Sequence, residues 1–149
     1  GDTRFIEATL RHVVDERGIL GKVVLVSEHY SRVMAYLNTD FRVSVRLLPL
    51  GAEGIVRWDG TRSDRLTLDY ISRTDPVRPG MIAVTSGYSD AFPPGLPVGV
   101  VREVEAREGR NQLDILLEPT SLLNRARFGF VILRVPDPEL RDIARERGL

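Results

Sequence analysis

The sequence predicts an all-β protein of two small antiparallel β-barrel subdomains, with short peripheral helices at the termini. First, apolar and polar residues alternate along segments such as 42–47 and 65–70, which is the period of a half-buried strand. Second, clusters of Gly, Pro, Asn and Asp separate such segments at hairpin distances. Third, a chain of 149 residues is long enough to bury one large core or two small ones without disulfide bonds.

Eight short strands are expected along the chain, and two turn sequences, at 38–40 and 108–111, predict antiparallel hairpins. The expected strands lie near 21–27, 32–37, 42–47, 65–70, 81–86, 97–105, 112–118 and 128–135. We expect their apolar faces to form the cores. The expected core residues are Val23, Val33, Val43, Val45, Leu66, Leu68, Val84, Val101, Ile115 and Ile132.

A short internal repeat supports two similar units. Residues 21–26 and 99–104 share the pattern G-x-V-x-x-V, and a polar turn and another strand follow each copy. A glycine that opens a strand equally serves a bulge or the close approach of two backbones. Both interpretations remain open from the sequence.

Helical patterns at the two ends and a proline-bearing middle divide the chain into four parts. Near the N-terminus, Ile6, Leu10 and Val13 recur at coiled-coil spacing, although Val13 could equally begin the first strand. Near the C-terminus, Asp137 is a good N-cap and Pro138 suits the first helical position. The predicted parts are the end of a coiled coil or a linker helix (1–12), a first barrel whose strands are open to exchange with the second (13–72), a second barrel (73–135) and a C-terminal helix (136–149).

Composition argues against several classes of function. Twenty-one Lys and Arg balance twenty-one Asp and Glu, and the two signs alternate, so we expect no nucleic-acid partner, which would need a basic groove. Without cysteine, the chain has neither disulfides nor thiolate metal ligands. The longest apolar runs, 23–26 and 130–133, fall far below the roughly 20 residues of a transmembrane helix. Attachment to a membrane would require an anchor outside this sequence.

No arrangement of residues for catalysis is recognisable. His12 and His29 lack the spacing of a metal site, and Ser86 does not lie in a G-x-S-x-G elbow. We therefore expect no catalytic residue, no metal and no cofactor. The enzymatic alternative is a two-barrel hydrolase of the chymotrypsin kind, which needs a Ser, a His and a carboxylate within hydrogen-bond reach.

Aromatic and proline residues outside the expected strands are the candidates for partner binding. They are Tyr30, Trp58, Tyr88, Phe92 and Pro93. Aromatic side chains on rigid loops bury a large area at small conformational cost, which makes them good anchors for protein contacts. The alternative is that Phe92 plugs the end of a barrel and Trp58 caps a core.

Four sequence segments together resemble the rod shape-determining MreC family of bacteria. They are LTLDYI at 66–71, VRPG at 77–80, VTSG at 84–87 and FPPGLPVGVV at 92–101. Their order and spacing are specific to that family. The resemblance covers about residues 13–135.

This resemblance implies an N-terminal membrane helix and a coiled coil, followed by two β-barrel subdomains on the extracytoplasmic (periplasmic) face of the cytoplasmic membrane. It implies a non-enzymatic scaffold of the cell-elongation complex, which synthesises peptidoglycan and determines rod shape. The expected partners are a class B penicillin-binding protein, MreD and other membrane members of the complex. A homodimer or a filament is also expected.

Overall fold

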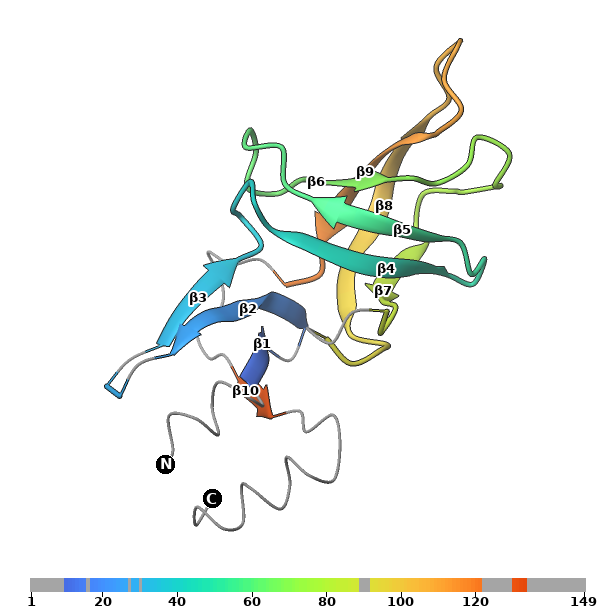
Figure 1. Ribbon diagram of the computed structural model, residues 1–149. Coiled ribbons are helices and arrows are strands. Elements are labelled where there is room, and N and C mark those ends of the chain that lie inside the picture. Colours follow the sequence, from blue (N-terminus) through green and yellow to red (C-terminus); the bar gives the residue numbers. More distant parts are fainter. Residues whose placement is uncertain are drawn as a thin grey trace.

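The structure, a computed structural model, describes residues 10–15, 17–26, 28–29, 31–88, 92–121 and 130–133. These residues include ten β-strands (Figure 1). The strands are β1 (Leu10–Asp15), β2 (Gly18–Val26), β3 (Ser31–Ala35), β4 (Arg42–Leu48), β5 (Glu53–Arg57), β6 (Leu66–Asp69), β7 (Ile82–Thr85), β8 (Pro97–Glu105), β9 (Asp114–Pro119) and β10 (Phe130–Leu133). Within these ranges, no helix has the length and hydropathy needed to cross a membrane.

Six strands close into an antiparallel barrel in the order β4-β5-β6-β9-β8-β7. Pairing of β4 with β7 closes it and aligns Val45 with Thr85 and Leu47 with Ala83. Alternation along β4 directs Val43, Val45 and Leu47 into the interior, where all three are buried. Because every barrel strand has a partner on both sides, the barrel offers no free strand edge.

The other four strands form an open antiparallel sheet in the order β10-β1-β2-β3. Gly21 of β2 permits its close approach to β3, because a Cβ at this position would clash with the backbone oxygen of Met34. In Figure 1 the sheet lies beside one end of the barrel. The Tyr36 hydroxyl, just after β3, donates a 2.7 Å hydrogen bond to the backbone oxygen of Ser121, just after β9.

Among the described residues, this architecture confirms an all-β fold with one closed barrel, and the second expected barrel is not confirmed. Strands within 42–119 form the one closed barrel, whereas 10–35 and 130–133 form the open sheet, in which β3 pairs only with β2 among the described strands. Residues 72 and 73 lie between β6 and β7, two strands of the closed barrel, and the expected division of the chain into four parts stays a prediction. The glycine of the first repeat copy serves close backbone approach, which was the alternative interpretation.

Three local predictions have different outcomes. The turn at 38–40 connects β3 to β4, which lie in different sheets, so the hairpin expected there is wrong. The turn at 108–111 connects β8 to β9, which pair in antiparallel fashion as predicted. In the N-terminal helix expected at 1–12, residues 10–12 belong to β1 instead, and residues 1–9 lie outside the described residues. The C-terminal helix expected at 136–149 also lies outside them.

Apolar side chains fill the barrel as one continuous core. The predicted core residues that are buried are Val43, Val45, Leu66, Leu68, Val101 and Ile115. The core also includes three aromatic side chains that were not among the expected core residues, Tyr36, Phe41 and Phe92. Ile132 was also expected in a core, but its side chain is not among those described.

Three expected core residues lie elsewhere. In β7, Ala83 and Thr85 point inward, so Val84 takes the outer face and is only half-buried. Val33 is 44% exposed because β3 is the edge strand of an open sheet, and Val23 on the neighbouring strand is half-buried. Period-two alternation locates a strand, but it does not decide which face is buried when a sheet stays open.

Gly54 tests the packing of β5 against β6. A Cβ on Gly54 would clash with the backbone oxygen of Asp69, and backbone cannot move aside as a flexible side chain can. We expect Gly54→Ala to lower the free energy of unfolding by about 2–3 kcal/mol. Guanidinium-chloride unfolding followed by the fluorescence of Trp58, the single tryptophan, measures this loss.

Gly51→Ala is the matched control on the same β4–β5 connection. Its added Cβ meets open space, and only the positive φ of 87° opposes it, at a cost of about 1 kcal/mol. A Gly54→Ala variant no less stable than Gly51→Ala would contradict the packing described for β5.

Candidate protein-interaction groove

The loop from residue 86 to residue 96 is built on the side chain of Thr85, the last residue of β7. Its hydroxyl donates a hydrogen bond to the backbone oxygen of Pro93 at 2.5 Å and accepts one from the Leu96 N–H at 2.9 Å. The Thr85 backbone also pairs with Gly95 and Leu96. A buried hydroxyl with both donor and acceptor roles filled gives the base of this loop a defined shape.

Phe92 fixes the loop from inside. Its ring packs edge to face against Phe41, with 6.3 Å between ring centroids, and only 2% of the residue is exposed. Phe92 therefore occupies the position anticipated in the alternative interpretation, as part of the core. Burial removes it from direct contact with a partner, while it supports the loop that carries Tyr88.

Tyr88 stands at the opposite extreme, because 85% of its surface is exposed. Its backbone N–H donates to the Ser86 hydroxyl at 3.1 Å, and the Ser86 N–H donates to the backbone oxygen of Ser44 in β4 at 3.0 Å. These contacts attach the start of the loop to the barrel wall. The tyrosine ring is thus presented from a positioned backbone.

A second exposed tyrosine, Tyr70, follows β6. Leu66 and Leu68 point into the core, so continued alternation would bury residue 70 as well. Instead Tyr70 has a φ of 72°, which directs it outward with 62% exposure and returns the next residue, Ile71, to the core. The left-handed conformation costs a non-glycine residue roughly 1–2 kcal/mol, and such residues gather at functional sites.

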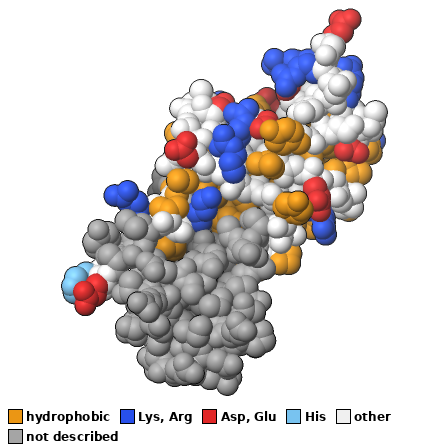
Figure 2. All heavy atoms as spheres, in the orientation of Figure 1, with side chains coloured by type: hydrophobic (Ala, Val, Ile, Leu, Met, Phe, Trp, Pro, Cys, Tyr) orange, Lys and Arg blue, Asp and Glu red, His pale blue; other side chains and the backbone are white. Residues whose placement is uncertain are grey.

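Tyr70 and Tyr88 line the same groove on the outside of the barrel. Its volume is about 240 Å³. The lining residues are Ser44, Val45, Glu53, Gly54, Ile55, Tyr70, Ser86 and Tyr88. Figure 2 shows hydrophobic side chains among polar and charged ones on the barrel face over β4 and β5. We call the groove lined by these residues the tyrosine groove.

Alternation of apolar residues explains why sequence analysis missed Tyr70. Residues 66–71 appeared as an uninterrupted strand, and no glycine or asparagine marked a left-handed position. The Tyr70 N–H is bound by the side-chain oxygen of Gln112 at 3.3 Å, from a segment 42 positions away in the sequence. A contact of that range leaves no local signal.

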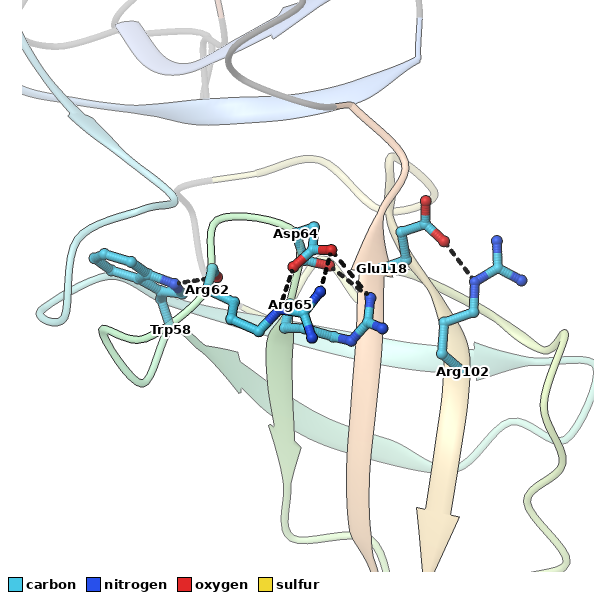
Figure 3. A network of polar contacts seen from close by, with 6 residues as sticks. All are labelled: Trp58, Arg62, Asp64, Arg65, Arg102 and Glu118. Carbon is cyan, nitrogen blue, oxygen red and sulfur yellow. Dashed lines mark hydrogen bonds and ion pairs between the residues drawn. The ribbon is translucent and has the colours of Figure 1, made fainter.

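Trp58 has a structural environment of its own in the connection between β5 and β6. The half-buried indole packs against the core, and its N–H donates to the backbone oxygen of Arg62 at 2.8 Å (Figure 3). Arg62 in turn binds Asp64 through two hydrogen bonds of 3.0 and 2.9 Å. Trp58 thus caps the core and shapes its loop, as the alternative interpretation held.

The remaining candidates are Pro93 and Tyr30. Pro93 is half-buried, and its backbone oxygen accepts the Thr85 hydroxyl. Tyr30 lies outside the described residues. Of the four candidates that the structure describes, Tyr88 is the one with a largely exposed aromatic ring, and the structure adds Tyr70 beside the same groove.

The described residues of the tyrosine groove include no group suited to proton transfer. None of these lining residues is a histidine, and the one carboxylate among them, on Glu53, makes a 3.0 Å ion pair with Arg46. Among the described residues, no cluster of three or more His, Cys, Asp or Glu side chains could hold a metal ion. Exposed aromatic rings, small side chains and rim hydroxyls suit the binding of another protein.

Residues 8–133 match the family model described as "Rod shape-determining protein MreC, barrel core". The cell shape-determining protein MreC of Haemophilus influenzae is 33% identical over 117 residues, which cover 78% of this chain and 33% of that protein. This chain thus spans about a third of the length of the curated relatives it matches.

Two solved structures share the fold. The crystal structure of MreC from Pseudomonas aeruginosa has a TM-score of 0.76 and 30% sequence identity, and the match covers 84% of this chain and 79% of that one. A complex between penicillin-binding protein PBP2 and MreC from Helicobacter pylori includes a matching chain with a TM-score of 0.65 and 19% identity. That match covers 86% of this chain and 79% of the other.

Alanine substitutions should separate the two aromatic residues of the loop. Phe92→Ala removes a buried ring and is expected to lower the free energy of unfolding by about 3–5 kcal/mol. Tyr88→Ala removes an exposed ring and should change it by less than about 0.5 kcal/mol. Chemical unfolding measures both values, and equal losses for the two variants would show that the loop is packed differently.

The loop after Trp58 gives a prediction about pH. The Thr61 hydroxyl and backbone N–H donate hydrogen bonds to Asp59, and these hold the pKa of its carboxyl below the ordinary value of 3.8. A lowered folded-state pKa adds stability above the unfolded-state pKa, and this stability is lost as the pH falls through the folded-state value.

Thr61→Val removes the hydroxyl donor, so the Asp59 pKa should rise toward its ordinary value. Carboxyl-carbon NMR titration between pH 2 and 6 measures it, and Ser63→Ala in the same loop is the control that should leave it unchanged. An unaltered Asp59 titration in Thr61→Val would refute the assigned cause.

Proposed function

This chain belongs to the MreC family of rod shape-determining proteins, and from that premise we propose that it acts as a non-enzymatic scaffold of the cell-elongation complex. In this proposal, the tyrosine groove binds a class B penicillin-binding protein. The chain works on the extracytoplasmic side of the cytoplasmic membrane, held there by an N-terminal anchor. MreD and further copies of the chain, as a dimer or a filament, complete the proposed assembly.

One observation carries the choice of partner. The Helicobacter pylori chain that shares this fold with a TM-score of 0.65 is in a complex with a penicillin-binding protein. The structural likeness supports a shared fold, and an identity of 19% gives no residue-by-residue correspondence. The contact residues proposed here therefore rest on the surface of this chain alone.

The chemistry of the tyrosine groove supports protein binding. Tyr70 and Tyr88 are 62% and 85% exposed, and tyrosine is among the residues that contribute most to interfaces. A tyrosine has only two side-chain torsions to immobilise, so its burial by a partner costs little entropy. Hydrogen bonds at Ser86 and Gln112 already fix the backbones at both tyrosines, which lowers the cost of binding further.

A scaffold that activates an enzyme must distinguish between two states of that enzyme. Binding shifts an equilibrium only by the difference between the affinities for the two states. We therefore propose that the groove binds one conformation of the synthase more tightly than the other. The closed barrel suits this role because it presents the two tyrosines on a surface without free strand edges.

The enzymatic alternative has weaker support. A hydrolase of the chymotrypsin kind needs a histidine beside its serine. Ser86 faces the groove, where its hydroxyl accepts the Tyr88 N–H, and no histidine is among the described residues that line this groove. The described histidine of the connection between β2 and β3, His29, is exposed.

Two substitutions test the groove as the binding surface. Tyr70→Ala and Tyr88→Ala are each expected to raise the dissociation constant for the class B penicillin-binding protein of the same cell by tenfold or more, about 1.4–3 kcal/mol. The reason is that each removes a largely exposed ring from the proposed contact. Isothermal titration calorimetry with the synthase ectodomain measures the effect.

Val24→Ala is the control, because Val24 is an exposed apolar residue of the open sheet, away from the groove. It should leave binding within a factor of two. Wild-type affinity in both tyrosine variants, with their melting temperatures unchanged, would exclude the groove as the binding surface.

A further inference from the structure

A second depression in the barrel wall, distinct from the tyrosine groove, gathers three arginines. Its volume is about 210 Å³, and it lies where β5, β6 and β9 meet the base of the β8–β9 hairpin. It shares no lining residue with the tyrosine groove. The polar lining residues are Arg57, Thr67, Asp69, Arg107, Arg110, Gln112 and Asp114.

The charges of this depression do not cancel. Arg57, Arg107 and Arg110 contribute three positive charges, and Asp69 and Asp114 contribute two negative ones, which leaves a net charge of +1 on the lining. Two charged neighbours outside the lining balance each other: Glu105 lies 3.6 Å from Arg107, and the Arg73 guanidinium binds the backbone oxygens of Arg107 and Arg110. In a chain with no net charge overall, this is a local excess that attracts an anion.

The two carboxylates leave many guanidinium donors available. The Arg57 Nε–H donates a hydrogen bond of 2.6 Å to Asp69 Oδ2. Within the described residues, this is the only hydrogen bond of the Arg57 guanidinium. Its two terminal nitrogens remain for another acceptor, since a guanidinium carries five N–H donors. One ion pair therefore orients the Arg57 guanidinium and leaves its other N–H donors available.

Asp114 is shared by the other two arginines. Its Oδ2 lies 2.9 Å from Arg107 Nε, and its Oδ1 lies 3.5 Å from Arg110 Nη1. Although the first contact is short, Oδ2 has no hydrogen bond of acceptable geometry among the described residues. We therefore count this contact as an ion pair, and Arg107 Nε also lies 3.6 Å from Glu105 Oε2. Within the described residues, the two terminal nitrogens of Arg107 make no hydrogen bond and remain as donors.

Contacts from the segment after β6 hold the base of the hairpin. The Arg73 guanidinium donates to the backbone oxygens of Arg107 at 2.7 Å and Arg110 at 3.3 Å, and the Arg73 N–H donates to the Asn111 oxygen at 2.9 Å. Gln112 accepts the Tyr70 N–H through its side-chain oxygen, so its amide N–H₂ is the group left for a ligand. The backbone that carries Arg107 and Arg110 is thus positioned before any ligand binds.

We propose that this depression, which we call the arginine pocket, is a binding site for a small oxyanion, a carboxylate or a phosphate group. Guanidinium forks match the oxygens of both groups, and such charge-assisted hydrogen bonds are about twice as strong as neutral ones. In this site Arg57, Arg107 and Arg110 supply the charge, and Gln112 adds a neutral donor.

Side-chain NMR of the wild-type chain tests the proposal without relying on any variant. Inorganic phosphate and acetate are titrated separately at pH 6 and constant ionic strength, with chloride as the balancing anion. We expect the Nε–H resonances of Arg57 and Arg107 to shift and saturate with at least one of the two anions. The anion that saturates at lower concentration identifies whether the pocket prefers a tetrahedral or a planar group.

Two variants then define the site. Arg107→Gln combined with Arg110→Gln should weaken the binding at Arg57 at least tenfold. Arg62→Gln is the matched control, because Arg62 is an exposed arginine already paired with Asp64 through two hydrogen bonds, and it should change nothing. Backbone amide spectra verify that each variant is folded.

Arg102, an exposed arginine paired with Glu118 at 2.6 Å, serves with Arg62 as a reference outside the pocket. Shifts that grow linearly with concentration, or that are equal at Arg57, Arg62 and Arg102, would mean general ionic screening and would overturn the proposal. The same holds for the absence of any shift with both anions. None of these outcomes bears on the tyrosine groove, since the two sites are lined by different residues.

Discussion

Pairing of β4 with β7 closes the barrel and positions the surfaces that this chain presents. Without that pairing, the loop after β7 would have no fixed relation to β4 and β5. The Ser86 N–H extends the contact beyond the strands by binding the Ser44 oxygen, which brings Tyr88 to the face that Ile55 and Tyr70 share. The tyrosine groove is therefore a consequence of barrel closure, and it assembles residues distant in the sequence.

The open sheet is attached to the barrel where the chain enters and leaves it. On the way in, Phe41 is fully buried, and Lys22 of the sheet lies over its ring at 5.7 Å, within the range of a cation–π contact. On the way out, the Ser121 oxygen accepts the Tyr36 hydroxyl. These contacts on the connections resist relative motion of the two parts, and such resistance suits a scaffold.

Particular elements show what the sequence was able to predict. Alternation in β4 and β6 identified the inward residues correctly, because both strands lie in a closed barrel with a single interior. The turn at 108–111 was recognisable because its partners are adjacent in the chain. Phe92 and Tyr88 were found as a loop pair, but sequence alone gave no means to tell which ring turns inward.

The errors have physical causes of longer range. The chain passes from β3 to β4 through a good turn sequence yet changes sheets there, because β4 finds its partners in β5 and β7. Tyr70 was not predicted because its left-handed backbone is held by Gln112, which lies just before the neighbouring strand β9 and 42 positions away in the sequence. The arginine pocket likewise draws on three separate segments, and its balanced local composition conceals the excess of donors.

Hydrogen–deuterium exchange of this chain, alone and mixed with the class B penicillin-binding protein proposed as its partner, tests the central claim most directly. The account predicts that bound synthase slows amide exchange at 44–55, 70 and 86–88 while leaving β1 and β3 unchanged. Protection confined to the open sheet, with the groove exchanging as in the free chain, would contradict it.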